Sequence, residues 1–175
     1  VTVDGTAVST VTKTAIDGGY KCTCTSPTLK DGSHTISVKA SDNDGNAAAA
    51  KTATFTVDTV PPTLQITAPS NDLVTNKKTV TITGKTDDVT SKPVTVTVNG
   101  ATVTVGTDGT FTKEVTLVEG ANTITIVAKD KAGKTTTVTR KVTVDTSAPV
   151  IKSITLTPNP VDCGKTFIIA VEITD

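Results

Sequence analysis

Residues 117–133 read LVEGANTITIVAKDKAG, and residues 29–45 read LKDGSHTISVKASDNDG. Both segments begin with Leu, reach a Gly three residues later, alternate apolar and polar positions, and end on an Asp-containing turn with Gly. Alternation with a period of two predicts a β-strand that has one buried face and one solvated face. Because the segments lie 88 residues apart (117 − 29 = 88), the chain contains an internal repeat.

A second pair of segments sets the length of the repeat. Residues 55–62 read FTVDTVPP and residues 142–149 read VTVDTSAP, which gives a spacing of 87 (149 − 62 = 87). In each segment a strand pattern ends on an aspartate, Asp58 or Asp145, before a proline-bearing linker. The repeat is therefore about 87 residues long, and the 175 residues span about two repeats.

The complete repeat contains a series of short strand patterns. Strands A, B and C are expected at residues 64–67, 79–83 and 94–98, a further run follows at 102–105, and strands E, F and G are expected at 111–117, 122–128 and 136–144. Threonine and valine dominate these runs, and such β-branched residues favour pleated sheet over helix. Asn99-Gly100 is a strong two-residue hairpin signal. The spacing predicts an all-β chain of tandem immunoglobulin-like Greek-key sandwiches.

Three motifs of the repeat carry a resemblance to a known family. The DGTF motif at residues 108–111, the segment 117–133 and the Val-Asp and Pro pattern at 144–149 resemble the tandem bacterial immunoglobulin-like repeats of cell-surface proteins, adhesins, S-layer-associated proteins and phage fibres. The resemblance implies the fold and an extracellular or cell-surface location. It implies no single function, because one module serves many proteins. The sequence has no Trp, so antibody-type recognition is not implied.

The phase of the repeat is unusual. Residues 149–175 match residues 62–88, which hold only strands A and B. Residues 1–5, VTVDG, correspond to VTVNG at 96–100, so the first domain begins in strand C. One sandwich is therefore complete and one is circularly split across the chain ends. The predicted parts are an incomplete domain with strands C to G at 1–60, a complete domain at 61–147, and strands A and B of a further domain at 148–175.

The two incomplete parts complement each other. A sandwich without strands A and B has unpaired edges and an open core, and an isolated hairpin is marginally stable in water. We expect strands A and B of one copy to insert into the first domain of the next copy, which gives a head-to-tail extracellular filament. The residues expected to fill the open core are Ile151, Ile154, Leu156, Phe167, Ile169 and Val171. The alternative is a set of spacer or ligand-binding modules from a larger adhesin, S-layer, phage-fibre or carbohydrate-active protein.

The three cysteines, Cys22, Cys24 and Cys163, cannot all pair within one chain. Cys22 and Cys24 lie on the segment equivalent to strand E, and Cys163 lies just before strand B of the C-terminal segment. Because strands B and E are neighbours in this type of sandwich, a disulfide from Cys163 to Cys22 or Cys24 of the next copy would lock the joint. The alternative is three buried free thiols, since cysteine packs as a small hydrophobe.

Calcium is the one cofactor for which the sequence offers candidate ligands. Asp42, Asp44 and Asn46 place oxygen atoms at alternate positions, as a hard cation prefers. The same residue types also favour a tight turn between strands F and G, and lysines enter the equivalent turn of the second repeat. Asp58 and Asp145 close strand G and are candidates for an interdomain calcium site; the alternative is that they cap the strand.

Composition argues against several function classes. Seventeen Lys and Arg balance 17 Asp and Glu, so no basic surface is expected to attract nucleic acid. No apolar run is long enough for membrane insertion, and aromatic residues make up 2% of the chain, too few for a good sugar-stacking platform. His34 is the only histidine and is expected to be solvated; no triad or zinc set accompanies it. We therefore expect no enzyme, and as partners other copies of the chain and a host-cell or surface ligand.

Overall fold

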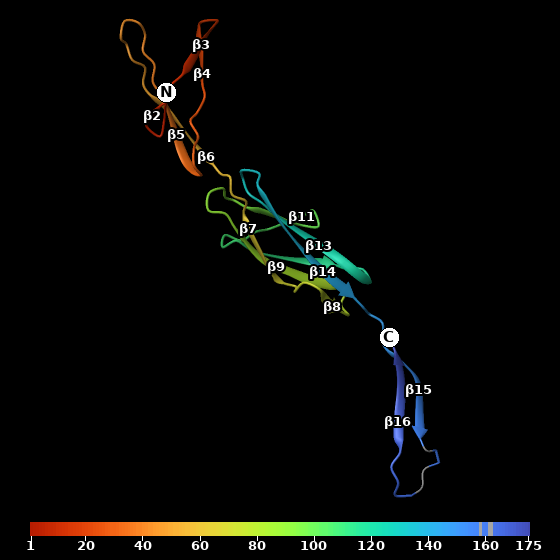
Figure 1. The fold of residues 1–175 in the computed structure, drawn as a ribbon. Helices are drawn as coiled ribbons and strands as arrows, with labels where there is room; N and C mark the ends of the chain where they lie inside the picture. The colour runs from red at the N-terminus through yellow and green to blue at the C-terminus, as the bar shows by residue number, and fades with distance from the viewer. Residues whose placement is uncertain (158, 161–162) are drawn as a thin grey trace.

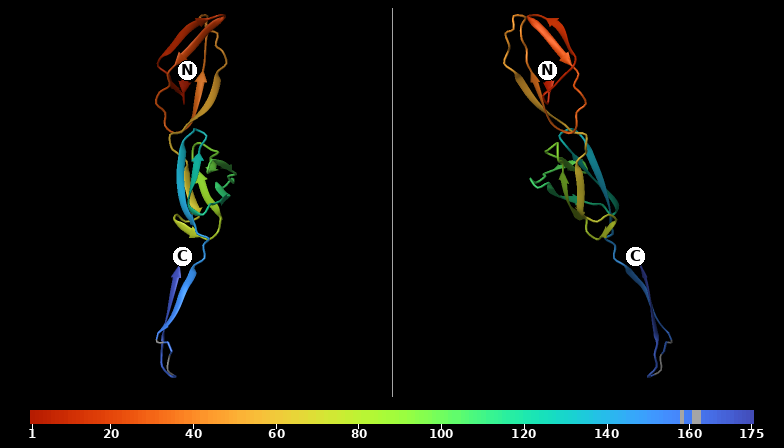
Figure 2. Two further views of the ribbon diagram at one scale, coloured as in Figure 1. Left: turned by 90° about the vertical axis from the view of Figure 1, so that its right-hand side faces the viewer. Right: turned by 60° about the vertical axis from the view of Figure 1, so that its left-hand side comes forward.

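The computed structural model describes residues 1–157, 159–160 and 163–175, and β-strands are the only regular elements among them. The all-β prediction is confirmed. Three parts follow one another along an extended molecule, with an N-terminal domain at one end, a sandwich in the middle and a hairpin at the other end (Figures 1 and 2). The described part of the chain contains no apolar helix of membrane-spanning length.

The middle domain is a sandwich of two sheets. The first sheet has the spatial order β12 (Thr110–Thr116), β9 (Thr79–Asp87), β7 (Thr63–Ala68). The second has the order β11 (Ala101–Val103), β10 (Thr95–Val98), β13 (Gly120–Lys129), β14 (Thr135–Val144), β8 (Leu73–Thr75). All neighbouring strands are antiparallel except β14 and β8, which are parallel. Each strand expected from the repeat is present, and β8 is the one strand of this domain that the sequence pattern did not predict.

The core of the middle domain lies between the inner faces of the two sheets. Ile82 of the first sheet and Ile124 and Ile126 of the second are fully buried. Val142 and Val144 of β14 join the same cluster, as the period-two alternation predicted. These residues form the core of the middle domain. Each large aliphatic side chain that is fully buried there contributes about 1.5–3 kcal/mol to the stability of the domain.

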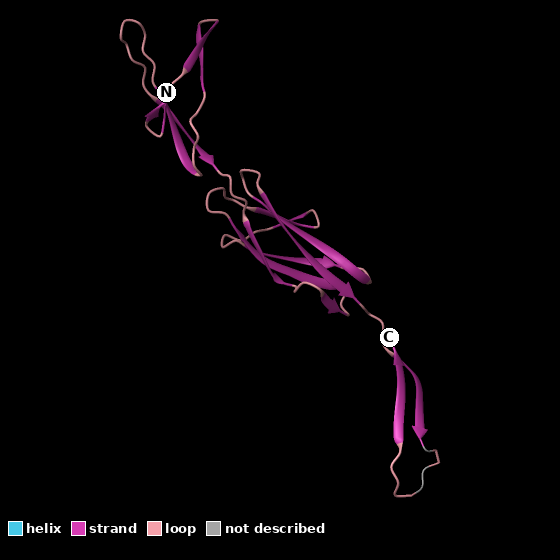
Figure 3. Ribbon diagram, viewed as in Figure 1, coloured by secondary structure: helices cyan, strands magenta, loops and turns pink. Residues whose placement is uncertain are grey.

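The N-terminal domain is one open sheet plus a separate hairpin. The sheet has the order β2 (Thr6–Ala7), β1 (Thr2–Val3), β5 (Gly32–Val38), β6 (Lys51–Val57). The hairpin consists of β3 (Val11–Ile16) and β4 (Gly19–Cys24). A long loop joins β5 and β6, as Figure 3 shows. By position in the repeat, β1, β5 and β6 are strands C, F and G, and β4 follows the same Asp-Gly turn as β12.

The C-terminal hairpin pairs β15 (Val150–Thr157) with β16 (Ile168–Thr174). Val150 lies opposite Thr174, and Thr63 lies opposite Asp87 in the first sheet of the middle domain. Both pairs are related by 87 residues, so the hairpin reproduces strands A and B of the repeat. The hairpin points away from the middle domain (Figure 1).

Candidate assembly surfaces

The C-terminal hairpin exposes a set of large apolar side chains. The exposed residues are Val150, Ile151, Ile154, Leu156, Phe167, Ile168, Ile169, Val171 and Ile173. Ile169 is 59% exposed, whereas Ile82, its equivalent one repeat earlier, is fully buried. All six predicted core-filling residues belong to this set. A contiguous exposed apolar surface of this kind marks an interaction site or an aggregation liability.

The N-terminal domain has an open inner face. Val3 is its one buried hydrophobic residue among those described. Val38 on β5 is 42% exposed, whereas its equivalent Ile126 on β13 is fully buried. The difference arises because β9 and β7 cover the second sheet of the middle domain, and the N-terminal domain has no such layer among the described residues.

One edge of β4 is unpaired. In the middle domain, β12 pairs with β9 along seven residue pairs. In the N-terminal domain β4 pairs only with β3, through Cys24 opposite Val11 at one end and Gly19 opposite Ile16 at the other. The edge of β4 that corresponds to the β12–β9 contact therefore offers free backbone donors and acceptors, as an edge strand does.

Comparison with known proteins identifies the class of module. Residues 1–59 match the family model described as bacterial Ig-like domain, and residues 62–146 match the model described as glucodextranase, domain B. The first match covers the N-terminal domain alone, and the all-β, tandem Ig-like fold predicted from the sequence is confirmed. Such modules are typically non-catalytic.

One curated relative and two solved structures are similar to this array of Ig-like domains. Bacillopeptidase F of Bacillus subtilis is 33% identical over 143 residues, which is 82% of this chain and 10% of that protein. The chain thus spans about a tenth of the length of the curated relative that it matches. The fibronectin(III)-like modules of Clostridium thermocellum CbhA align at a TM-score of 0.42 with 22% identity, covering 76% of each chain. A tetra-tandem repeat in the extending region of a large adhesion protein aligns at 0.42 with 23% identity, covering 89% of this chain and 49% of that one.

All three cysteines of the Ig-like array are exposed, so the alternative of three buried thiols is wrong. Cys22 and Cys24 are on β4, two residues apart on an exposed strand, and Cys163 is exposed in the turn before β16. All three are free thiols. The disulfide between copies stays a prediction.

The turn between β5 and β6 holds the predicted calcium ligands. Asp42 Oδ1 accepts hydrogen bonds from the backbone nitrogens of Asp44 and Asn46, and Asp42 Oδ2 accepts one from Asn46 Nδ2 at 2.8 Å. These bonds lower the pKa of Asp42, with the Asn46 side chain as the main cause. Both carboxylate oxygens of Asp42 are therefore engaged by the turn itself. Calcium binding by Asp42, Asp44 and Asn46 stays a prediction.

His34 differs from expectation. Its side chain is only 11% exposed, because Nδ1 lies 2.6 Å from Asp4 Oδ2, Nε2 lies 2.8 Å from the Lys30 carbonyl, and the ring packs 5.6 Å from Phe55. The expectation of a solvated histidine was wrong, since neighbouring loops supply partners that the sequence does not reveal. The bonds fix β1 to β5 and provide no nucleophile.

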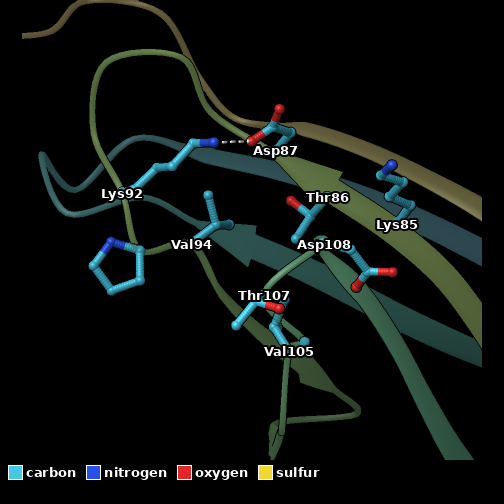
Figure 4. Close-up of a pocket in the computed structure, with 11 residues that line it drawn as sticks. Lys85, Thr86, Asp87, Lys92, Val94, Val105, Thr107 and Asp108 are labelled. Atoms are coloured by element: carbon cyan, nitrogen blue, oxygen red, sulfur yellow. Dashed lines mark ion pairs between the residues drawn. The ribbon is translucent and has the colours of Figure 1, made fainter.

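A cavity of about 350 Å³ lies near one end of the middle domain, between the ends of β9 and β12 (Figure 4). Lys92 pairs with Asp87 there at 2.8 Å, and Lys85 and Asp108 also line the cavity. The lining contains no histidine, cysteine or glutamate. The groups around this cavity therefore do not form a nucleophile–base pair of the usual kinds.

Proposed function

We propose that this array of Ig-like domains is a non-catalytic, extracellular structural subunit that joins head to tail by β-strand addition. The observation that supports the proposal is the match between two exposed surfaces. The hairpin exposes Ile151, Phe167 and Ile169, whose equivalents Leu64, Val80 and Ile82 lie in or against the core of the middle domain. The N-terminal domain exposes the face that such residues cover in the middle domain. Docking the hairpin of one copy on the N-terminal domain of another would bury both.

The middle domain supplies the register for this contact. There, Phe111, Lys113 and Val115 lie opposite Gly84, Ile82 and Val80. Strand β4 is equivalent to β12 when their Asp-Gly turns are aligned, and β16 is equivalent to β9 one repeat later. The pairs of the middle domain therefore predict that, in the docked contact, Tyr20 lies opposite Val171, Cys22 opposite Ile169, and Cys24 opposite Phe167. The new sheet would have the order β4, β16, β15, as the middle domain has β12, β9, β7.

The first of these pairs cannot copy the middle domain. A Cβ atom at Gly84 would lie 2.6 Å from Cζ of Phe111, so the Phe111 ring needs a glycine opposite it. Val171 replaces that glycine in the hairpin. Tyr20 is 71% exposed, and it would have to turn its ring aside when the hairpin docks.

A disulfide bond is not required for this contact between copies. Cys163 precedes Phe167 by four residues, so on an extended strand it lies about 13 Å beyond the level of Cys24. A disulfide needs Cα atoms within about 7 Å. A crosslink therefore requires the turn that holds Cys163 to fold back toward β4, and we attribute assembly to the strand ladder and to apolar burial.

The second candidate function is a spacer within a larger secreted or surface protein, in which continuous chain completes each domain. The short share of Bacillopeptidase F that this chain matches favours it. In that case residues that follow the hairpin in the larger protein complete its domain, and the hairpin does not add to the N-terminal domain of another copy.

Size measurements with substitutions in the hairpin test the first candidate. Purified full chain is expected to form a concentration-dependent series at multiples of 17.8 kDa in gel filtration with light scattering, and fibres in negative stain. Ile169→Asp should abolish the series, because it places a charge in the new core. Val118→Asp is the matched control, since Val118 is 69% exposed on the middle domain, and it should assemble like the wild type.

Two outcomes oppose the proposal. A wild-type chain that stays monomeric at high concentration overturns it in favour of the spacer, and equal assembly by Ile169→Asp overturns the assigned contact. The thermal unfolding of the middle domain should be the same in both variants, because Ile169 lies outside its core.

A further inference from the structure

Three aspartates from different segments meet at the joint between the N-terminal and middle domains. Asp58 follows β6 at the end of the N-terminal domain, Asp88 follows β9, and Asp130 follows β13. One carboxylate oxygen of each lies within 4.8 Å of the others. The three residues are only 9%, 6% and 5% exposed. Aspartates are rarely buried in this way unless they are paired.

The local turns use only part of each carboxylate. Asp58 Oδ1 accepts a hydrogen bond from the Val60 nitrogen, and Asp130 Oδ1 accepts one from the Lys134 nitrogen at 2.8 Å. Asp88 Oδ1 accepts two, from the nitrogens of residues 90 and 91. Oδ2 of Asp58 and Oδ2 of Asp130 are buried and have no hydrogen-bond partner. A buried carboxylate oxygen without a partner destabilises the folded protein, so a ligand that binds these two atoms would stabilise it.

No cation of the protein neutralises the cluster. Among the described residues, the ion pairs are Lys92 with Asp87 and His34 with Asp4, and neither involves the three aspartates. Carboxylates this close repel one another when ionised. A bound cation would remove the repulsion and satisfy both unpartnered oxygens at once.

We propose that Asp58, Asp88 and Asp130 bind one Ca²⁺ ion at this joint. Ca²⁺ takes carboxylate oxygens at about 2.4 Å, so two oxygens on one ion lie at most about 4.8 Å apart, as the three aspartates do. Mg²⁺ binds at about 2.1 Å and requires a tighter octahedron. A cavity of about 390 Å³ opens beside Asp58, with Ser91 and Lys131 in its lining, and gives the ion and its water ligands a way in.

The ion ties two domains together. Asp58 directly follows the last strand of the N-terminal domain, whereas Asp88 and Asp130 belong to loops of the middle domain. A shared ion therefore fixes the angle between the domains. The rod is expected to be stiff with Ca²⁺ and to bend at residues 58–62 without it. This function goes beyond assembly and does not depend on it.

Comparison with the Asp42 turn explains why Asp130 is free to bind. Asp42 precedes Asp130 by 88 residues, and its backbone nitrogen donates to Asn46 as that of Asp130 donates to Lys134. The Asn46 amide occupies the second oxygen of Asp42. Lys134 stands in place of Asn46, and the second oxygen of Asp130 stays unpartnered. The lysine at this turn, which in the sequence argued against calcium binding, thus leaves the ligand atom of Asp130 unoccupied.

Calcium titration of the metal-depleted, monomeric full chain tests the proposal. Calorimetry should show one site at the joint with a dissociation constant of about 10⁻⁴ to 10⁻³ M, the range of extracellular calcium modules, and at least tenfold weaker binding of Mg²⁺. Asp58→Asn and Asp130→Asn should each weaken Ca²⁺ binding at least tenfold. Both substitutions keep the oxygen that caps the local turn, so neither should unfold its domain.

Glu114→Gln is the matched control, because it removes one negative charge from an exposed carboxylate on β12 and should leave Ca²⁺ affinity within twofold of the wild type. Small-angle scattering should show a greater maximum dimension with Ca²⁺ for the wild type and for Glu114→Gln, and no change for Asp58→Asn. A wild type that binds no Ca²⁺ at millimolar concentration overturns the proposal. So does an Asp130→Asn variant that binds as tightly as the wild type.

Discussion

At the scale of single residues, the middle domain depends on the absence of a side chain at Gly84. A Cβ atom there would lie 2.6 Å from the Gln65 carbonyl oxygen and 2.6 Å from the Phe111 ring. Backbone cannot yield easily, so we expect Gly84→Ala to lower the free energy of unfolding by about 1–3 kcal/mol in urea denaturation. Gly19→Ala is the control, because a Cβ atom at Gly19 meets nothing within 4 Å. Equal stability of the two variants would contradict this account.

The His34–Asp4 pair predicts a pH dependence confined to the N-terminal domain. The Asp4 carboxylate, and next the Lys30 carbonyl, raise the pKa of His34 above its usual 6.5, and His34 and the Thr35 nitrogen lower the pKa of Asp4 below 3.8. The stabilisation from His34 is full below pH 6.5 and is lost as pH rises through the raised pKa. That from Asp4 is full above pH 3.8 and is lost as pH falls through the lowered pKa.

NMR titration of the His34 ring checks this window. We expect a midpoint above 6.5 in the wild type and a return toward 6.5 in Asp4→Asn, while the middle domain unfolds identically in both. A wild-type midpoint at or below 6.5 would show that the pair does not form. His34→Asn is the second variant, because Asn122 occupies the equivalent position, and it should remove the pH dependence without unfolding the domain.

Among the strands, the sequence was sufficient to predict where most regular elements lie. It was insufficient to predict which loops contact one another. Period-two alternation located β9, β13 and β14 within a few residues, because each has a wet and a buried face. It missed β8, whose three residues are too short to show a period and which pairs in parallel with β14. Of the three joint aspartates, only Asp58 was predicted to contact calcium. Asp88 and Asp130 lie in loops that the sandwich fold of the middle domain brings together, and their approach to Asp58 depends on how the two domains pack.

Strand addition predicts a change in backbone protection. In monomeric chain, amides of β15, β16 and the free edge of β4 should exchange with solvent much faster than those of β13 and β14, because the hairpin has no covering layer. In assembled material the peptides that contain β4 and β16 should become protected. Hydrogen exchange with mass spectrometry on gel-filtration fractions measures both. Assembled fractions in which these peptides still exchange quickly would assign the contact to another surface.

Along the length of the molecule, the repeat produces a second joint with equivalent aspartates, at the boundary between the middle domain and the C-terminal hairpin. Asp145 and Asp175 follow Asp58 and Asp88 by 87 residues each. Asp145 Oδ1 accepts a hydrogen bond from the Ser147 nitrogen as Asp58 does from Val60. The third position of this joint lies in the turn between strands F and G of the next domain. If the N-terminal domain of another copy completes that domain, the third carboxylate is Asp42 of that copy.

Assembly is therefore expected to create a second calcium site between copies, formed by Asp145 and Asp175 of one chain and by Asp42 of the next, whose Oδ2 exchanges its hydrogen bond from Asn46 Nδ2 for the ion. Light scattering should show that Ca²⁺ lowers the concentration at which wild-type chain assembles. Asp175→Asn should remove most of that dependence and leave Ca²⁺ affinity of the monomer unchanged, because Asp58, Asp88 and Asp130 are intact. Glu114→Gln serves again as the charge-matched control. Equal calcium dependence in Asp175→Asn and the wild type would show that the joint between copies is held by strand pairing and apolar contact alone.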